Sequence, residues 1–358
     1  LGLVTHGAAA AAGVIAVVLA FFWAGVWALA VKYVLLSAFT SLFLWAVNPW
    51  YPKQWISRRS VRKLFGFGSK LALAGLLNEV FQNVYKVVIG KFFAAATLGF
   101  YTQAQNFQRL ASQSLVGMLQ KVTYPVLAKA NDDPARLKRG YRTMIQVSSY
   151  VIFPAMIGMA LTAEPLILTL VGESWRQTIP FLQLLCVSGA LYHLHSINLN
   201  VLKVVGRSDL FLRLEVIKKV NITVAIVIGL QFGLWGLLIG HVVSSYVALF
   251  INMYYTRQFI DYSIPEQLRD IVGVLLFSVP MAVAVWVAGM IVSDMPAVEL
   301  AAMVVAGAVS YVLVGMLAGA EPRRTIVALI APRLRRSRRL TVDAPSPVAE
   351  TVNAPTSR

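Results

Sequence analysis

An apolar run of about 40 residues, 8–47, constrains this chain more than any other feature of its sequence, and Lys32 is the one charged residue within it. As a single helix the run would be about 60 Å long, roughly twice the thickness of the hydrocarbon core of a bilayer. It must therefore turn back on itself. The sequence predicts the turn at residues 23–27, where a glycine permits tight backbone and two tryptophans suit the membrane interface.

The same reasoning predicts an all-α, polytopic transmembrane helix bundle of about ten spans for the whole chain. The composition agrees, because 58% of the residues are hydrophobic and 13% are charged, whereas a soluble domain carries about 25% charged residues. These values exclude an ordinary soluble enzyme and a disordered protein. The predicted spans are residues 8–22, 26–47, 66–91, 98–124, 140–163, 179–205, 216–232, 234–256, 270–292 and 298–319.

Lysine and arginine residues are distributed unevenly between alternate loops. Segments 48–65, 125–142, 203–219, 257–269 and 320–358 hold 25 of the 32 Lys and Arg residues, and the alternate connections hold two. Because cytoplasmic loops carry an excess of Lys and Arg, both ends of this chain are predicted to be cytoplasmic. The net charge of +17 is then explained by topology and by contact with anionic membrane lipids, and we expect no nucleic-acid partner.

A short internal repeat indicates how the spans are grouped. Residues 25–29 match residues 233–237, and each segment follows one apolar span and opens another. Internal repeats are common in transporters. If the two matching hairpins end two lobes, the first lobe would begin roughly 140 residues before Leu1, with room for about four more spans. Most of the first lobe is therefore expected to be missing from this chain.

This grouping divides the chain into five predicted parts. They are the last two helices of the N-terminal lobe (1–47), a basic cytoplasmic linker (48–65), a six-helix C-terminal lobe (66–256), two additional C-terminal helices (257–320) and a basic, largely disordered cytoplasmic tail (321–358).

Four of the predicted spans carry a row of polar side chains along one helical face. Charged and amide groups at bilayer depth are costly and normally face protein or water, so these rows predict a hydrated, net-cationic interior shared between helices. The rows are Gly75, Glu79, Gln82 and Lys86; Thr102, Asn106, Arg109, Gln113, Gly117 and Gln120; Gly189, His193, Ser196, Asn200 and Lys203; and His241, Ser244, Ala248, Asn252 and Tyr255.

Lys86 and Arg109 are the predicted contacts for an anionic group. Both lie deep in their spans beside amides, and the guanidinium fork matches the oxygens of a phosphate. Glu79 and His241 are candidates for coupling to an ion. Structural interpretations stay open, because Glu79 and Arg109 would also fit a packing ion pair and the histidines would fit hydrogen-bonded helix contacts. The other residues predicted to line the cavity and bind substrate are Gln82, Asn106, Gln113, Asn200, His193 and Ser196.

The sequence lacks the motifs that enzyme chemistry requires. His193 and His195 have no acidic or cysteine companions of the kind found in metal sites. There is no GxSxG sequence, no Walker A sequence and no acidic cluster for a metal-bound sugar nucleotide. We therefore predict no catalytic residue, no metal site and no cofactor, and we expect that the chain is not an enzyme.

Five segments carry a resemblance to a known family, and the last of them is the most specific: residues 66–93, 101–114, 120–129, 164–175 and 194–219. They resemble the polysaccharide-biosynthesis flippases of the multidrug/oligosaccharidyl-lipid/polysaccharide exporter superfamily, in particular the lipopolysaccharide and exopolysaccharide (Wzx, WzxC-like) branch. The resemblance implies a MATE-like fold of two six-helix lobes, often with two further helices. It also implies that undecaprenyl-pyrophosphate-linked oligosaccharide repeat units are moved across the bacterial inner membrane to the periplasmic leaflet.

The leading hypothesis is therefore a flippase for lipid-linked oligosaccharides that works by alternating access and is not driven by ATP. The cationic rows would hold the pyrophosphate and sugars in water while the polyprenyl tail stays in lipid. The implied partners are this lipid-linked oligosaccharide, the membrane lipids, and polysaccharide polymerase or export components. Two alternatives stay open. A drug or cation antiporter of the same superfamily should have an acidic or aromatic cavity, and a membrane-embedded glycosyltransferase or polymerase would need a catalytic group.

Overall fold

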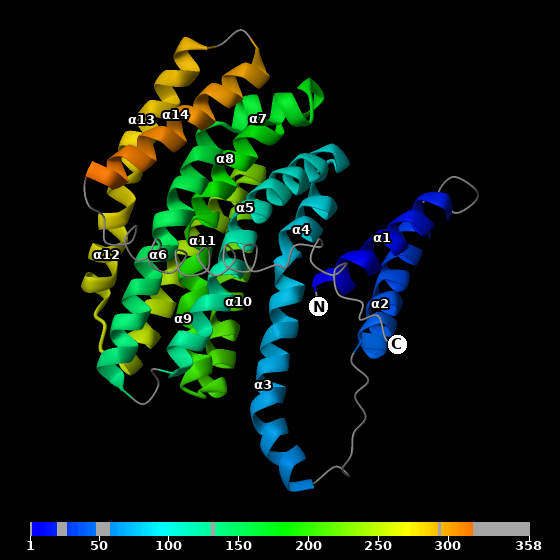
Figure 1. The fold of residues 1–358 in the computed structure, drawn as a ribbon, viewed down its shortest axis with the longest axis vertical. Helices are drawn as coiled ribbons and strands as arrows, with labels where there is room; N and C mark the ends of the chain where they lie inside the picture. The colour runs from blue at the N-terminus through cyan, green and yellow to red at the C-terminus, as the bar shows by residue number, and fades with distance from the viewer. Residues whose placement is uncertain (1, 20–26, 48–57, 130–132, 293–294, 318–358) are drawn as a thin grey trace, which may run out of the picture. The chain divides into compact units, whose positions relative to one another are not determined.

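A computed structural model describes residues 2–19, 27–47, 58–129, 133–292 and 295–317 of the protein. Over these ranges every regular element is a helix (Figure 1). The predicted all-α class is therefore confirmed. The chain divides into two compact units, Leu1–Leu64 and Phe65–Arg358, and each is described by itself below.

The first unit contains α1 (Gly2–Leu19) and α2 (Trp27–Val47), which pack on each other. Most of α1 and all of α2 lie within the apolar run 8–47. Residues 23–26 of the predicted turn lie outside the described residues.

The second unit contains the remaining helices, and α3 begins just before its boundary. Its elements are α3 (Arg58–Gln82), α4 (Val84–Phe92), α5 (Ala95–Lys129), α6 (Pro134–Leu161), α7 (Ala163–Leu170), the short 3₁₀ helix η2 (Glu173–Trp175), α8 (Thr178–Gly189), α9 (Tyr192–Val204), α10 (Ser208–Gln231), α11 (Gly233–Ile260), α12 (Ile264–Leu276), α13 (Ser278–Ile291) and α14 (Pro296–Leu317).

Helices lie over each of the ten predicted spans, as far as the described ranges reach. Within the described ranges, four helical segments are long and apolar enough to cross a membrane: Ala135–Leu161, Gly233–Ile260, Ile264–Ile291 and Pro296–Leu317. Several of the other spans carry the polar rows, which lower their mean hydropathy. Membrane crossing by those helices stays a prediction.

The start of α10 differs from the prediction. The sequence placed the beginning of this span at residue 216, whereas the helix begins at Ser208. Charged side chains in its first two turns, Asp209, Arg213 and Glu215, delayed the apolar signal and assigned these turns to a cytoplasmic loop. The helix therefore carries charged residues that the prediction had placed outside the bundle.

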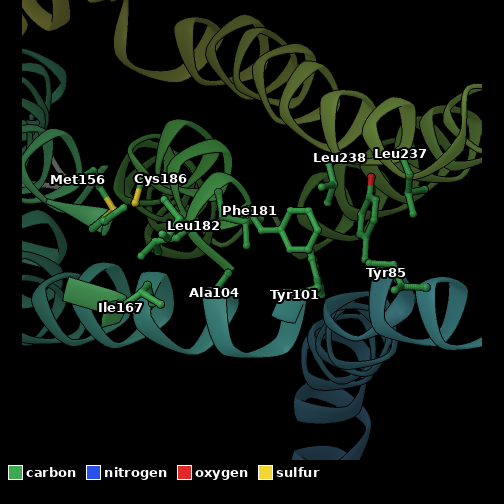
Figure 2. Packing of buried hydrophobic residues seen from close by; sticks show 14 of the residues in the cluster. Tyr85, Tyr101, Ala104, Met156, Ile167, Phe181, Leu182, Cys186, Leu237 and Leu238 are labelled. Carbon is green, nitrogen blue, oxygen red and sulfur yellow. The ribbon is translucent and has the colours of Figure 1, made fainter. Parts of the chain in front are cut away.

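The interior of the second unit is held by packed aromatic and aliphatic side chains rather than by polar contacts alone. Figure 2 shows Tyr101 of α5 against Phe181 of α8, and Tyr85 of α4 directed toward Leu237 and Leu238 of α11. In a membrane, close packing of this kind contributes to helix association because lipid tails are as apolar as the side chains themselves.

The α10–α11 hairpin requires glycine at its turn and at the contact between its two helices. Gly233 at the turn has a φ of 69°, a left-handed conformation that L side chains rarely adopt. Farther from the turn, a Cβ on Gly229 would lie 2.7 Å from the carbonyl oxygen of Gly236. The two helices therefore approach closely enough that a methyl group does not fit between them.

A polar cluster around the buried Asp270 carboxylate joins α6 to α12. Arg142 holds both oxygens of the Asp270 carboxylate, through Nε at 2.6 Å and Nη2 at 2.7 Å. Gln146 donates to the same carboxylate at 3.2 Å, and the Tyr262 hydroxyl is a further donor. The bidentate geometry fixes the register between the two helices.

Candidate functional site

A polar cavity with a volume of 510 Å³ lies within the second unit, between α3, α9, α10 and α11. Small-molecule sites in proteins typically enclose about 300–1,000 Å³, so the cavity has the size of a ligand site. We call it the lysine cavity. Its lining residues are Leu71, Ala74, Gly75, Asn78, Tyr192, His195, Ser196, Leu199, Lys203, Phe211, Glu215, Lys218, Lys219, Ile222, His241, Ser244, Ser245 and Ala248.

The charged residues of the lysine cavity are three lysines and one glutamate, which give it a formal charge of +2. Lys218 forms an ion pair with one oxygen of Glu215, and Lys219 lies 3.2 Å from the other oxygen. The 3- and 4-residue spacing along α10 places all three side chains on one helical face. Lys203, on α9, has its ammonium 5.1 Å from the centre of the Phe211 ring.

The carboxylate therefore neutralises part of the positive charge and leaves the cavity cationic. The side chain of Glu215 is only 4% exposed, and those of Lys218 and Lys219 are 10% exposed. Charges this poorly hydrated interact strongly with any ionic group that enters the cavity, because little water screens them.

Several lining residues of the lysine cavity are joined by hydrogen bonds to one another and to Asn221 and Asn252. The Asn252 amide nitrogen lies 3.0 Å from Nδ1 of His195, and Nε2 of the same histidine lies 3.3 Å from the Ser245 hydroxyl. Asn221 also donates to the backbone and side-chain oxygens of Ser244, at 2.9 Å and 3.1 Å.

Ser196 and His241 are the two predicted site residues that line the lysine cavity. His241 also packs edge-on against Tyr85, with ring centres 4.6 Å apart, so α11 contacts α4 at this point. His193 points elsewhere. Its Nε2 lies 2.8 Å from the Ser149 hydroxyl and its ring packs edge-on against Phe153, which is the hydrogen-bonded helix contact that was left open as an alternative.

The remaining predicted residues do not line this cavity. Asn200 is buried in α9, whereas Glu79 on α3 and Asn106 and Gln113 on α5 are exposed. The four polar rows therefore do not surround one shared cavity. The rows of α3, α9 and α11 contribute to it, the row of α5 does not, and α10 supplies charges that no row had predicted.

Gln82, Lys86 and Arg109 lie where α3 ends and α4 begins. Arg109 on α5 donates through Nη2 to the backbone carbonyl oxygen of Gln82 at 3.0 Å, which satisfies a carbonyl at the end of a helix. The Gln82 amide lies 3.5 Å from a Glu79 oxygen. No ion pair joins Glu79 to Arg109 in the described part of the chain.

Glu215, Lys218 and Lys219 are the site residues that sequence reasoning missed. Both lysines lie in segment 203–219, which was predicted to be a basic cytoplasmic segment, and the glutamate had no predicted role. Their spacing of a carboxylate followed by lysines three and four residues later is itself a helical signal, and it could have placed them on one face of α10.

Comparison with known proteins places the chain in a family. Residues 3–180, about half of the chain, match the profile of a family described as "Polysaccharide biosynthesis protein". The chain belongs to this polysaccharide biosynthesis family. Its membership agrees with the resemblance noted from the sequence.

Three curated relatives of this family member come from different bacteria. The teichuronic acid biosynthesis protein TuaB of Bacillus subtilis (strain 168) is 28% identical over 53% of this chain and 40% of its own length. The lipopolysaccharide biosynthesis protein WzxC of Escherichia coli (strain K12) is 26% identical over 71% of this chain and 52% of its own. The succinoglycan biosynthesis transport protein ExoT of Rhizobium meliloti (strain 1021) is 28% identical over 60% of this chain and 44% of its own.

The chain therefore spans about half the length of these relatives, or less. Among solved structures, the inward closed conformation of the lipid II flippase MurJ matches with a TM-score of 0.69 at 12% identity, over 87% of this chain and 66% of that one. This likeness shows a shared fold. Together with the apolar helices, it identifies a multi-pass, all-α membrane helix bundle.

Proposed function

We propose that this polysaccharide biosynthesis family member works as part of a flippase for lipid-linked oligosaccharides. The substrate would be a repeat unit joined through pyrophosphate to a polyprenyl lipid such as undecaprenol, moved across the bacterial inner membrane by alternating access without ATP. In this proposal the protein is a transporter and not an enzyme, and both ends of this chain face the cytoplasm.

The observation that carries the proposal is the lysine cavity. Burying several charged groups inside a membrane helix bundle costs free energy. Ionisable residues at such depth commonly mark a substrate route. Lys203, Lys218 and Lys219 supply ammonium groups from α9 and α10, and Asn78 adds an amide from α3. Ammonium groups are common partners of phosphate oxygens, so these residues suit the pyrophosphate group.

The polar groups around the lysines suit the first sugar of the substrate. His195 and Ser245 are held in place by the network described above, and Ser196 and His241 lie on the same cavity wall. Side chains that are already fixed lose little further entropy when they bind hydroxyl groups. Names of the relatives support the same class, since they include a lipopolysaccharide biosynthesis protein and a succinoglycan biosynthesis transport protein.

We propose that the predicted residues of α3, α4 and α5 form a second region that contacts the substrate. Lys86 and Arg109 would meet anionic groups outside the lysine cavity, with Gln82, Asn106 and Gln113 as hydrogen-bond partners for sugars, and Asn200 and His193 would act from within the helix packing. Glu79 and His241 would couple transport to an ion. These roles are proposals that rest on residue type and helical position.

The charge of the cavity also separates this proposal from the cation-antiporter alternative. A cavity for cationic cargo requires an available carboxylate, whereas Glu215 is already paired with Lys218 and Lys219. A formal charge of +2 repels a cation and attracts an anion.

Polymer export in cells tests the proposed function. In a strain deleted for the gene, plasmid-borne Lys203→Gln and Lys218→Gln variants should lose most exported polymer at wild-type protein level, while Lys70→Gln, an exposed α3 residue outside the cavity, should keep it. Either single cavity change leaves Glu215 paired with at least one lysine, so the fold should survive. Normal export by both cavity variants would refute the proposal.

A further inference from the structure

Two apolar pockets adjoin the lysine cavity on the outer side of α10. The first, with a volume of 310 Å³, lies between α3 and α10 and is lined by residues such as Leu77, Phe81 and Val220. The second, with a volume of 630 Å³, lies between α10 and α11. Figure 1 shows α3 and α10 running alongside each other in this part of the unit.

Shared residues make the three pockets neighbours. Lys219 lines both the lysine cavity and the α3–α10 pocket, and Val224 lines both the α3–α10 and the α10–α11 pockets. Ser244 lines both the lysine cavity and the α10–α11 pocket. A charged compartment is therefore followed directly by an apolar groove along α10.

Lys219 stands at the boundary between the two compartments. Its ammonium lies 3.0 Å from the Asn78 side-chain oxygen, 3.2 Å from Glu215 and 5.6 Å from the centre of the Phe81 ring. Its ammonium therefore belongs to the polar side, while its hydrocarbon stem borders the groove. The boundary between the lysine cavity and the groove is therefore formed by a side chain. No backbone segment needs to move for a ligand to extend from one into the other.

The groove opens at the surface of the unit rather than into its interior. Val216, Val220 and Val224 follow each other at four-residue spacing on α10, and they are 45%, 59% and 50% exposed. Such a row presents one continuous apolar face. From residue 216 to the end of α10 the helix extends about 22 Å, which is most of the hydrocarbon thickness of a bilayer.

We propose that the hydrocarbon tail of the pyrophosphate-linked polyprenyl lipid leaves the lysine cavity beside Lys219 and lies in the groove between α3 and α10. This inference rests on the proposed function and adds the side of the bundle on which the tail is held. The charge selects this occupant, because a pyrophosphate diester carries one negative charge on each of its phosphoryl units and so matches the +2 cavity. A phospholipid with a single phosphodiester would leave positive charge unpaired.

Photo-crosslinking of the purified full chain in lipid nanodiscs tests the inference. The probe is a polyprenyl pyrophosphate with a diazirine near the head of its tail, and labelled peptides are located by mass spectrometry. Labels are expected within residues 77–81 and 216–224. Unlabelled polyprenyl pyrophosphate should compete for labelling, whereas phosphatidylglycerol at the same concentration should not.

Two variants at similarly exposed positions on different helices form the matched comparison. Val220→Trp fills the groove and should lower labelling there about tenfold, if the bulk removes contacts worth one decade of affinity. Val283→Trp is the control, because Val283 is 55% exposed on α13 and lines a separate apolar pocket, and labelling should be unchanged. Lys218→Gln should also weaken competed labelling about tenfold, since it removes a charged hydrogen-bond donor.

The outcomes separate this inference from the proposed function. Labelling that is competed and depends on Lys218, yet falls on α13 or α14 and is insensitive to Val220→Trp, would overturn the tail route and leave the proposed substrate standing. Labelling that is neither competed nor affected by Lys218→Gln would overturn both. Equal competition by phosphatidylglycerol would reduce the groove to a general anionic-lipid contact and would also refute the inference.

Discussion

Replacement of Glu215 by Gln should lower the stability of the protein and raise its affinity for anions. Its carboxylate is 4% exposed, and the Lys219 ammonium lies 3.2 Å from one of its oxygens. At an effective dielectric constant of about 20, that one contact is worth about 5 kcal/mol before the cost of desolvation is subtracted. Removing one partner from a buried ion pair costs about 3–5 kcal/mol, because the charge that stays behind is uncompensated.

The same change raises the formal charge of the lysine cavity by one unit. Two ammonium groups, those of Lys218 and Lys219, would then face the cavity without their shared carboxylate. We therefore expect Glu215→Gln to lower the free energy of unfolding by about 3–5 kcal/mol and to bind inorganic pyrophosphate more tightly than the wild type. Pyrophosphate at 100 times its dissociation constant should restore about 2.7 kcal/mol of the loss.

Thermal and denaturant unfolding in detergent, with and without pyrophosphate, measures both effects. The control is Glu173→Gln, because Glu173 contacts Arg176 at 2.5 Å with its side chain 70% exposed. An exposed pair of this kind contributes little to stability, because water and salt screen it. The reasoning is refuted if Glu215→Gln is no more destabilising than Glu173→Gln, or if pyrophosphate protects it less than it protects the wild type.

Two further predictions concern the fold around the site. Gly229→Ala should destabilise the protein by about 1–3 kcal/mol in thermal unfolding, because its Cβ would lie 2.7 Å from the Gly236 carbonyl oxygen. Gly273→Ala in α12 meets nothing within 4 Å and should be neutral or stabilising, so equal effects of the two changes would contradict this account. Glu266 accepts from the backbone N–H of Ser263 at 2.8 Å, and the Ser263 hydroxyl accepts from the backbone N–H of Glu266, so the two residues cap the start of α12. Ser263→Ala should therefore lower the unfolding midpoint, by about 1 kcal/mol of stability, and an unchanged midpoint would refute the assignment.

The helical class and the order of the spans followed from the sequence because bilayer thickness and backbone hydrogen bonding leave few choices to an apolar chain. Apolar runs locate helices well, but they do not show where a helix ends when its terminal turns carry charged residues. The first turns of α10 illustrate this, since Arg213 and Glu215 fell outside the predicted span although they lie within Ser208–Gln231.

The polar rows indicated that polar side chains gather between the helices, but they named few of the residues that line the lysine cavity. A row fixes which side chains share a face, but it does not say which neighbouring helix that face meets. His193 and Ser196 belong to the same row of α9, yet His193 packs against Ser149 of α6 while Ser196 lines the cavity. On the row of α5, Asn106 is exposed. Helix packing, which the sequence alone does not supply, decides between these outcomes.

Equilibrium binding of a polyprenyl-pyrophosphate-linked oligosaccharide to the purified full chain tests the central claim most directly. Thermophoresis in detergent should give dissociation constants that rise about tenfold for Lys203→Gln and for Lys218→Gln, since each removes a charged donor to the pyrophosphate. Lys70→Gln should bind as the wild type does. Equal affinity in all four proteins would show that the cationic cavity is not where the lipid-linked sugar is held.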